Sequence, residues 1–139
     1  MVVRDVRVLA QALAGEFGSP IRAADELRFF LRRADLDPAD RAIYLPPAPH
    51  VARPGLLLAR LVSGWQRERF VTLAVGHHVL RHRDLEHYTY GPDGPLFDSP
   101  LEAAEADHFA GVFIQHCRGY NGSRFTRFVD VDSARSARR

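Results

Sequence analysis

The sequence contains no lysine, and its 19 basic residues are all arginine. The 17 acidic residues leave a net charge of +2 at pH 7, and they are interspersed with the arginines along the chain. A nucleic-acid-binding domain usually gathers its basic residues on one face or along one stripe. The charge pattern therefore argues against nucleic acid as the main partner.

The chain also has only one cysteine and lacks a long apolar run. Cys117 cannot form a disulfide within the chain or a thiolate cluster by itself, so we expect it to be a small buried hydrophobe. A membrane span needs about 20 consecutive apolar residues. Charges at Arg4, Asp5 and Arg7 interrupt the apolar region that a signal peptide requires. These absences predict a soluble, cytoplasmic protein without a membrane segment.

Length and composition fit one α+β domain. The 139 residues, 46% of them hydrophobic, are enough for one core of ordinary size. We predict a single domain over residues 1–132, with helices packed around a small mixed or antiparallel sheet. The arginine-rich residues 133–139 have the composition of a disordered basic tail.

Residue spacing indicates the elements of this domain. Apolar residues three and four positions apart predict amphipathic helices over residues 2–17, 26–35, 63–83 and 99–117. Short apolar runs bounded by proline and glycine predict strands over residues 42–45, 55–62 and 124–131. A buried helical segment fits 55–62 equally well, because periodicity does not separate the two.

Two helix starts carry capping signals. Ser19 followed by Pro20 is typical of a cap and a first helical position. Ser99, Pro100 and Glu102 form the pattern of a capping box, in which serine and glutamate side chains bond to backbone N–H groups.

The stretch VTLAVGHHVLRH, residues 71–82, holds three histidines near the end of a predicted helix. His78 and His82 are four residues apart, which on a helix places both imidazoles on one face, the spacing of a zinc site. A zinc peptidase of this kind also needs a glutamate after the first histidine to transfer a proton. Here that position is Val79, whose aliphatic side chain cannot move a proton.

Two segments of the chain resemble the active site of the ImmA/IrrE metallopeptidases. The run RERFVTLAVGHHVLRH, preceded by GLLLARLVSGW, resembles the family's R-F-T-L-A-H-E-L-G-H region. EADHFAGVFI, residues 105–114, resembles its E-A-N-x-F-A-x-x-L-L motif, in which the glutamate is the third zinc ligand. The resemblance covers roughly residues 42–116. It implies a zincin-like site between two helices, with Glu105 as a ligand and zinc as the cofactor.

The sequence departs from the family at the catalytic motif. Three alignment registers place His77, His78 or His82 at the second histidine of the motif. In every register an alanine or a valine occupies the position of the catalytic glutamate. The loss of a general base typically costs on the order of 10²- to 10⁴-fold in rate. An ordinary working peptidase is therefore not expected.

A metal site without catalysis remains one hypothesis. The candidate ligands are His78, His82 and Glu105, with His77 and His108 as further candidates. Nitrogen and oxygen ligands of this kind suit zinc. In the alternative arrangement, His77 packs into the apolar stripe of its helix while His78 and His82 face solvent or the following loop. Glu105 then pairs with an arginine such as Arg81.

Three functions follow from these observations. The first is a degenerate metallopeptidase-like domain, a pseudoenzyme that binds a regulatory protein. The resemblance implies a helix-turn-helix repressor in phage or mobile-element transcription regulation as that partner. The second is an active zinc endopeptidase with an altered site that cleaves such a repressor. The third is an arginine-mediated binder of nucleic acid or the transcription machinery, using Arg124, Arg127 and the tail.

Overall fold

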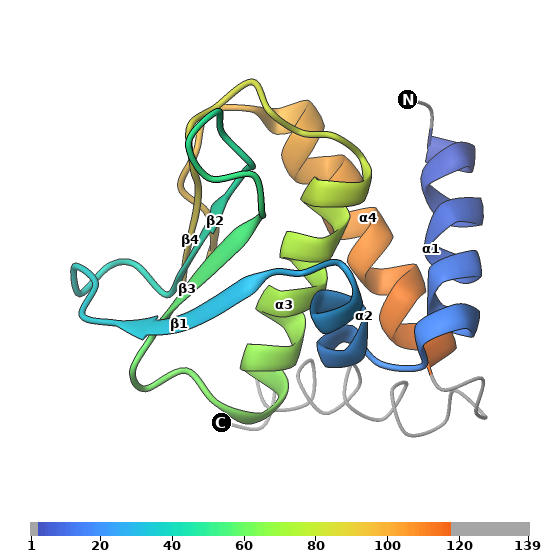
Figure 1. The fold of residues 1–139 in the computed structure, drawn as a ribbon, viewed down its shortest axis with the longest axis horizontal. Helices are drawn as coiled ribbons and strands as arrows, with labels where there is room; N and C mark the ends of the chain where they lie inside the picture. The colour runs from blue at the N-terminus through green and yellow to red at the C-terminus, as the bar shows by residue number, and fades with distance from the viewer. Residues whose placement is uncertain (1–2, 118–139) are drawn as a thin grey trace.

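The computed structural model describes residues 3–117; the predicted strand over 124–131 and the predicted tail lie outside them. Within the described range, helices cover one face of a five-stranded sheet (Figure 1). The α+β prediction is therefore confirmed. No helix in this range combines the length and apolar character needed to cross a membrane.

The sheet is mixed, with the strand order β1-β3-β2-β4-β5. Its strands are β1 (Phe30–Ala34), β2 (Ala42–Leu45), β3 (Gly55–Ala59), β4 (Tyr88–Gly91) and β5 (Gly94–Pro95). β1 runs parallel to β3, and the other neighbouring pairs are antiparallel. The apolar run at 42–45 is a strand as predicted. The ambiguity over 55–62 is resolved in favour of a strand over residues 55–59, and residues 60–62 lie in the turn that follows it.

Helices α1 (Val3–Phe17), α2 (Pro20–Glu26), α3 (Gly64–Val79) and α4 (Pro100–His116) form the second layer. α3 lies against β2 and β3, and α4 packs between α3 and α1. The inner face of the sheet meets this layer through Leu56, Tyr44 and Tyr88, which form one row across three strands and are each at most 1% exposed. Cys117 is fully buried, as predicted.

The helix predicted over residues 26–35 is wrong. Ser19 Oγ accepts a hydrogen bond from Arg22 N at 3.1 Å, so the predicted cap is present, but the helix ends at Glu26. Arg28 adopts the left-handed conformation, with φ 64°. Arg28 N bonds to Asp25 O and Phe29 N bonds to Ala24 O, which is a Schellman motif that ends the helix.

After this turn the chain continues as β1. Phe30 N bonds to Pro54 O, and the Phe30 ring lies over Gly55, where a Cβ atom would meet it at 2.0 Å. Pairing with β3 thus satisfies the backbone of Phe30–Ala34 and packs its aromatic ring. The helical spacing over residues 26–35 involves only a few apolar residues, and pairing with β3 outweighs it.

Gly76 tests the packing of α3 against α4. A Cβ atom there would lie 2.9 Å from Phe109 Cδ1, inside the core, so Gly76→Ala is expected to lower the free energy of unfolding by about 1–3 kcal/mol. Gly111→Ala on α4 meets nothing within 4 Å, and its better helix propensity should raise stability by up to about 1 kcal/mol. Urea unfolding of both variants measures the difference. Equal effects would contradict this packing.

Candidate functional site

The end of α3 determines which histidines meet. Arg81 is left-handed, with φ 60°, and Arg81 N bonds to His78 O while His82 N bonds to His77 O. These two bonds form a second Schellman motif, in which the residue after the left-handed one folds back onto the last turn of the helix. His82 therefore leaves the helical path and lies against His77. It does not share a helix face with His78.

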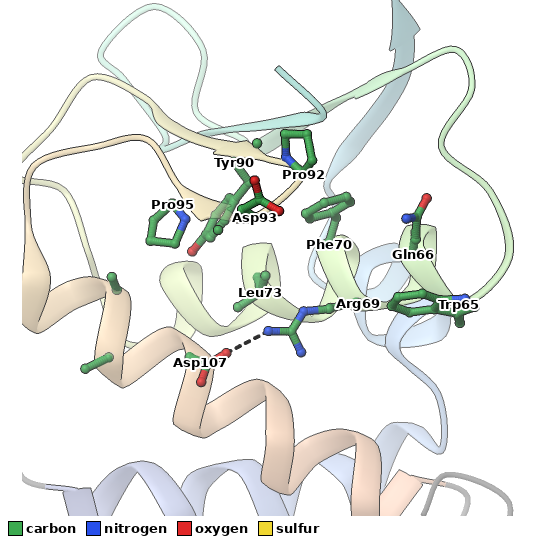
Figure 2. A pocket seen from close by; sticks show the side chains of 14 residues that line it. Trp65, Gln66, Arg69, Phe70, Leu73, Tyr90, Pro92, Asp93, Pro95 and Asp107 are labelled. Carbon is green, nitrogen blue, oxygen red and sulfur yellow. Dashed lines mark hydrogen bonds and ion pairs between the residues drawn. The ribbon is translucent and has the colours of Figure 1, made fainter. Parts of the chain in front are cut away.

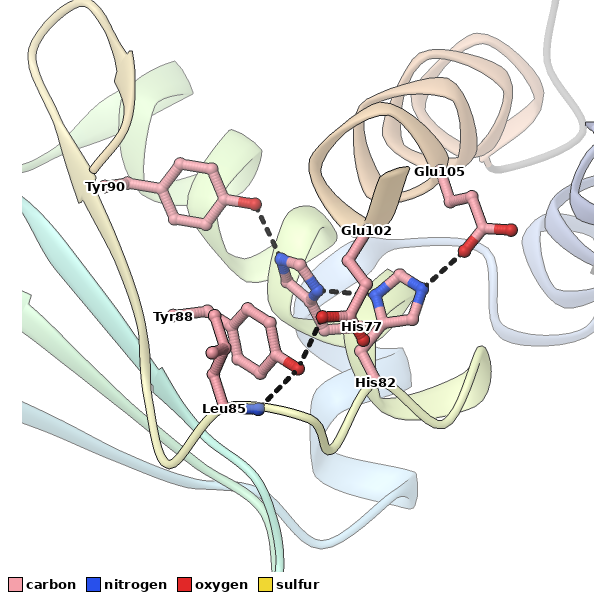
Figure 3. Close-up of polar contacts among 7 residues, drawn as sticks. All are labelled: His77, His82, Leu85, Tyr88, Tyr90, Glu102 and Glu105. Atoms are coloured by element: carbon pink, nitrogen blue, oxygen red, sulfur yellow. Dashed lines mark hydrogen bonds and ion pairs between the residues drawn. The ribbon is translucent and has the colours of Figure 1, made fainter. Parts of the chain in front are cut away.

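Four buried side chains form a continuous chain of hydrogen bonds (Figure 3). Tyr90 Oη lies 2.6 Å from His77 Nε2, and His77 Nδ1 lies 2.7 Å from His82 Nδ1. His82 Nε2 is 2.8 Å from Glu105 Oε1. We call Tyr90, His77, His82 and Glu105 the histidine cluster. It connects β4, the end of α3 and α4, and it uses all four ring nitrogens of its two histidines.

A second hydrogen-bonded pair lies beside the cluster. Tyr88 Oη donates to Glu102 Oε1 at 2.9 Å and accepts from Leu85 N at 3.3 Å. Glu102 is 7% exposed, and burial raises the pKa of Tyr88 to about 12. The predicted capping box is wrong. Ser99 occupies the cap position, but its side chain makes no cap hydrogen bond, and the Glu102 carboxylate accepts from Tyr88.

Aromatic rings enclose His77 and favour its neutral form. The imidazole is fully buried and stacks on the rings of Tyr88, at 4.5 Å between centroids, and Tyr44, at 5.6 Å. Burial lowers the pKa of His77 well below its ordinary value, and the positive charge of a protonated His82 would lower it further. Burial also raises the pKa of Tyr90. Both groups stay uncharged at neutral pH.

Only part of the predicted ligand set comes together. His82 and Glu105 are in direct contact, and His77 completes the group. His78 points elsewhere: its half-buried ring meets the Phe29 ring edge-on at 5.5 Å. Its pKa is lowered by burial and by the charge of Arg83. His108 is absent from the hydrogen bonds of the cluster, and its Nε2 is buried without a partner.

The cluster in this arrangement does not fit a zinc ion. Zinc binds histidine nitrogen at about 2.0–2.1 Å in tetrahedral geometry, which separates two ligand nitrogens by roughly 3.3 Å. His77 Nδ1 and His82 Nδ1 are closer, at 2.7 Å, and are bonded to each other. Across residues 3–117, no three His, Cys, Asp or Glu side chains are placed to hold a metal ion.

A groove of about 570 Å³ lies beside the cluster, between α3, α4 and the β4–β5 hairpin (Figure 2). Its walls include the apolar and aromatic side chains of Trp65, Phe70, Leu73, Tyr90, Pro92 and Pro95. Arg69 on α3 and Asp107 on α4 form an ion pair across it, at 2.8 Å. Tyr90 belongs to both features, because its ring lines the groove while its hydroxyl joins the histidine cluster.

The sequence interpretation missed this groove. The glycines and prolines of YGPDGP, residues 90–95, are typical of a turn-rich loop, whereas this segment forms the hairpin that makes one wall. The available signals were the only tryptophan of the chain, Trp65, and the alternation of tyrosines at 88 and 90. Neither indicates a groove until the hairpin is placed opposite α3 and α4.

The histidine cluster predicts defined tautomers. An ionised Glu105 can only accept, so a neutral His82 carries its one proton on Nε2 and its Nδ1 accepts from His77 Nδ1–H. His77 Nε2 then accepts from the Tyr90 hydroxyl. Long-range ¹H–¹⁵N correlation spectra should show the Nδ1–H form of His77 and the Nε2–H form of His82. The opposite pair of tautomers would contradict an ionised Glu105.

Stability is expected to fall in mild acid. The unfolded chain binds a proton at His77 below about pH 6.5, whereas the folded chain does not, so the free energy of unfolding decreases as pH falls below that value. The slope approaches about 1.4 kcal/mol per pH unit for each such histidine. Urea unfolding between about pH 7.5 and 5 measures it.

Two variants locate the source of this pH dependence. His77→Gln should reduce the slope, whereas His50→Gln, at an exposed position in the β2–β3 connection, should leave it unchanged. Stability that is constant or increases toward acid would contradict a buried neutral His77.

No protein-family model matches the chain, and neither does any curated protein. The resemblance to the ImmA/IrrE metallopeptidases therefore rests on the two motifs alone, and the function must be argued from the cluster and the groove.

Proposed function

We propose that this chain is a cytoplasmic, regulatory protein-binding module that holds an extended segment of its partner in the groove without cleaving it. The observation that carries the proposal is the closure of the histidine cluster. Each ring nitrogen of His77 and His82 is bonded to a protein atom, and the two residues are 0% and 4% exposed. The groups that a peptidase would use for catalysis are occupied with one another.

The chemistry of the cluster supports binding over hydrolysis. A general base must reach the water or the substrate with a free lone pair, but His77 Nε2 faces the Tyr90 hydroxyl at 2.6 Å. Burial raises the pKa of Tyr90, so its hydroxyl does not supply a phenolate. Val79, which follows His78, has no proton to transfer. The side chains of the histidine cluster therefore stabilise the fold, and none of them is free to act as a general base.

The groove supports a polypeptide ligand. Its volume of about 570 Å³ accommodates a few side chains, and its walls offer tryptophan, phenylalanine and tyrosine surfaces that favour apolar contact. The exposed Arg69–Asp107 ion pair, with side chains 44% and 65% exposed, adds one donor and one acceptor for main-chain or polar groups. Such a site orients a segment without covering it completely.

The resemblance to ImmA/IrrE proteins supports the partner class. A domain that has kept the scaffold and lost the base would bind the kind of protein that an active member cleaves, a helix-turn-helix repressor in phage or mobile-element regulation. This partner is proposed from the two motifs, and the groove is the surface proposed to contact it.

A peptide selection tests the groove as the binding surface. From a displayed library of random peptides, those that bind the wild-type chain should lose binding by tenfold or more, about 1.4 kcal/mol, in Ala104→Arg, which places a long side chain at the groove wall. Gln115→Arg is the matched control, because it adds the same charge at another exposed position of α4. Titration of each peptide by fluorescence anisotropy measures the affinities.

The same peptides separate binding from cleavage. Incubation with the chain and added zinc should leave them intact by mass spectrometry. Zinc-dependent cleavage that disappears in Glu105→Gln would establish the alternative, an altered zinc endopeptidase. Equal binding by the Ala104→Arg and Gln115→Arg variants would move the binding surface away from the groove.

A further inference from the structure

The outer face of the sheet carries apolar side chains that none of the helices described over residues 3–117 covers. Side chains alternate along a strand, so the residues between the buried Tyr44, Leu56 and Tyr88 point away from the helices, which all lie on the other side (Figure 1). These outward apolar residues are Phe30, Ala34, Ile43, Leu45, Leu57 and Ala59. They are half-buried, and we call them the outer apolar face.

So many apolar side chains are unusual on a sheet face that is exposed to solvent. A sheet solvated on one side normally alternates apolar-in and polar-out, whereas strands buried on both sides read as continuous apolar runs. β3 reads GLLLA and β2 reads AIYL. Among the outward positions of β1 to β4, only Arg32 and Thr89 are polar. The strands have the sequence of a sheet that is covered on both faces.

Charges at the two ends of this face have opposite sign. At the start of β1 and β3, the guanidinium groups of Arg32 and Arg53 lie 5.9 and 5.8 Å from the centre of the Phe30 ring. At the other end, the β1–β2 connection carries Asp35, Asp37 and Asp40.

The acidic end retains a negative excess. Arg41 and Arg60 also lie there, and Arg60 is bonded to Asp35 at 2.6 Å. Arg33, the third arginine at this end, belongs to the inner face, where its guanidinium bonds to the carbonyls of Ala59 and Val62. Around the outer face, three carboxylates therefore stand against two guanidinium groups. The face therefore has a basic end and an acidic end, separated by aliphatic side chains.

We propose that a second copy of this chain covers the outer apolar face in a two-fold symmetric dimer. A two-fold axis that lies between the sheets and runs across the strands brings the aliphatic centres together. It also places the basic end of each copy over the acidic end of the other. An isologous interface requires such self-complementarity, because the same patch serves both subunits. The pairing is independent of the groove, which lies on the opposite side of the sheet among α3, α4 and the β4–β5 hairpin.

The face formed by the strands is small compared with a typical stable interface. Five-residue strands at about 3.3 Å per residue and four strands about 4.8 Å apart give a projected area of roughly 16 by 19 Å. A typical stable interface buries about 800 Å² per partner, so the strands alone are too small. We therefore include the connections over residues 35–41 and 46–54, which join the strands of this face, in the proposed interface, and we expect a dissociation constant in the micromolar range.

Sedimentation analysis of the full chain over about 1–200 µM spans that range and should show the mass rising toward twice that of the monomer. Leu57→Glu places a charge at the centre of the face and should weaken the dimer by at least about tenfold. Leu101→Glu is the matched control, because Leu101 is 69% exposed and lies on α4, on the helix side of the sheet and away from the face. Circular dichroism confirms that each variant is folded.

A charge exchange keeps the test decisive if Leu57→Glu does not fold. Arg32→Glu is at an exposed position, should weaken the dimer, and should regain part of the affinity when Asp37→Arg is added. A chain that stays monomeric at all concentrations, or a dimer that Leu57→Glu leaves unchanged, overturns the proposal. A monomer in which Leu57→Cys reacts with thiol reagents far more slowly than Leu101→Cys would show that the chain covers this face itself.

Discussion

The contact on which the arrangement around α3 depends is the hydrogen bond between His77 and His82. Two imidazoles with little access to water would each leave a costly unpaired nitrogen, and this bond removes one such group from each ring at 2.7 Å. The outer nitrogens are then satisfied by Tyr90 and Glu105. The bond therefore connects the end of α3 to both the sheet and α4, and it holds Tyr90 in the wall of the groove.

The same contact explains why the histidine cluster is closed to catalysis while the groove beside it stays accessible. In a zinc peptidase, imidazole and carboxylate groups between two helices bind the metal and transfer the proton. In this chain they bond to one another, and no carboxylate stands beside the first histidine of HVLRH to serve as a base. What remains accessible is the neighbouring groove, whose aromatic walls and exposed Arg69–Asp107 pair suit recognition of a polypeptide. The two histidines and Glu105 thus hold the fold together, and the proposed recognition uses the neighbouring groove.

The sheet adds a second constraint that the helices do not satisfy. Tyrosines and leucines of its inner face are buried against the helices. The outer face carries aliphatic side chains between two arginines at one end and three aspartates at the other. Apolar area exposed to water contributes roughly 25 cal/mol per Å² when it becomes buried. A partner on this face and a ligand in the groove would lie on different sides of the molecule, so neither would block the other.

The sequence by itself determined the elements whose signals are local: the strand at 42–45, the helix start at Pro100 and the burial of Cys117. For residues 55–59 the apolar run fits a strand and a buried helix equally well, and pairing with β1 and β2 decides for the strand. It did not determine β1 or the histidine partners, because each depends on a left-handed residue that is an arginine where glycine is the usual signal, at Arg28 and Arg81. The four-residue spacing of His78 and His82 presupposes a helix that continues, whereas α3 stops at Val79. Only tertiary packing decided this, since the Schellman turn buries His82 against His77 and α4, where Glu105 completes its hydrogen bonds.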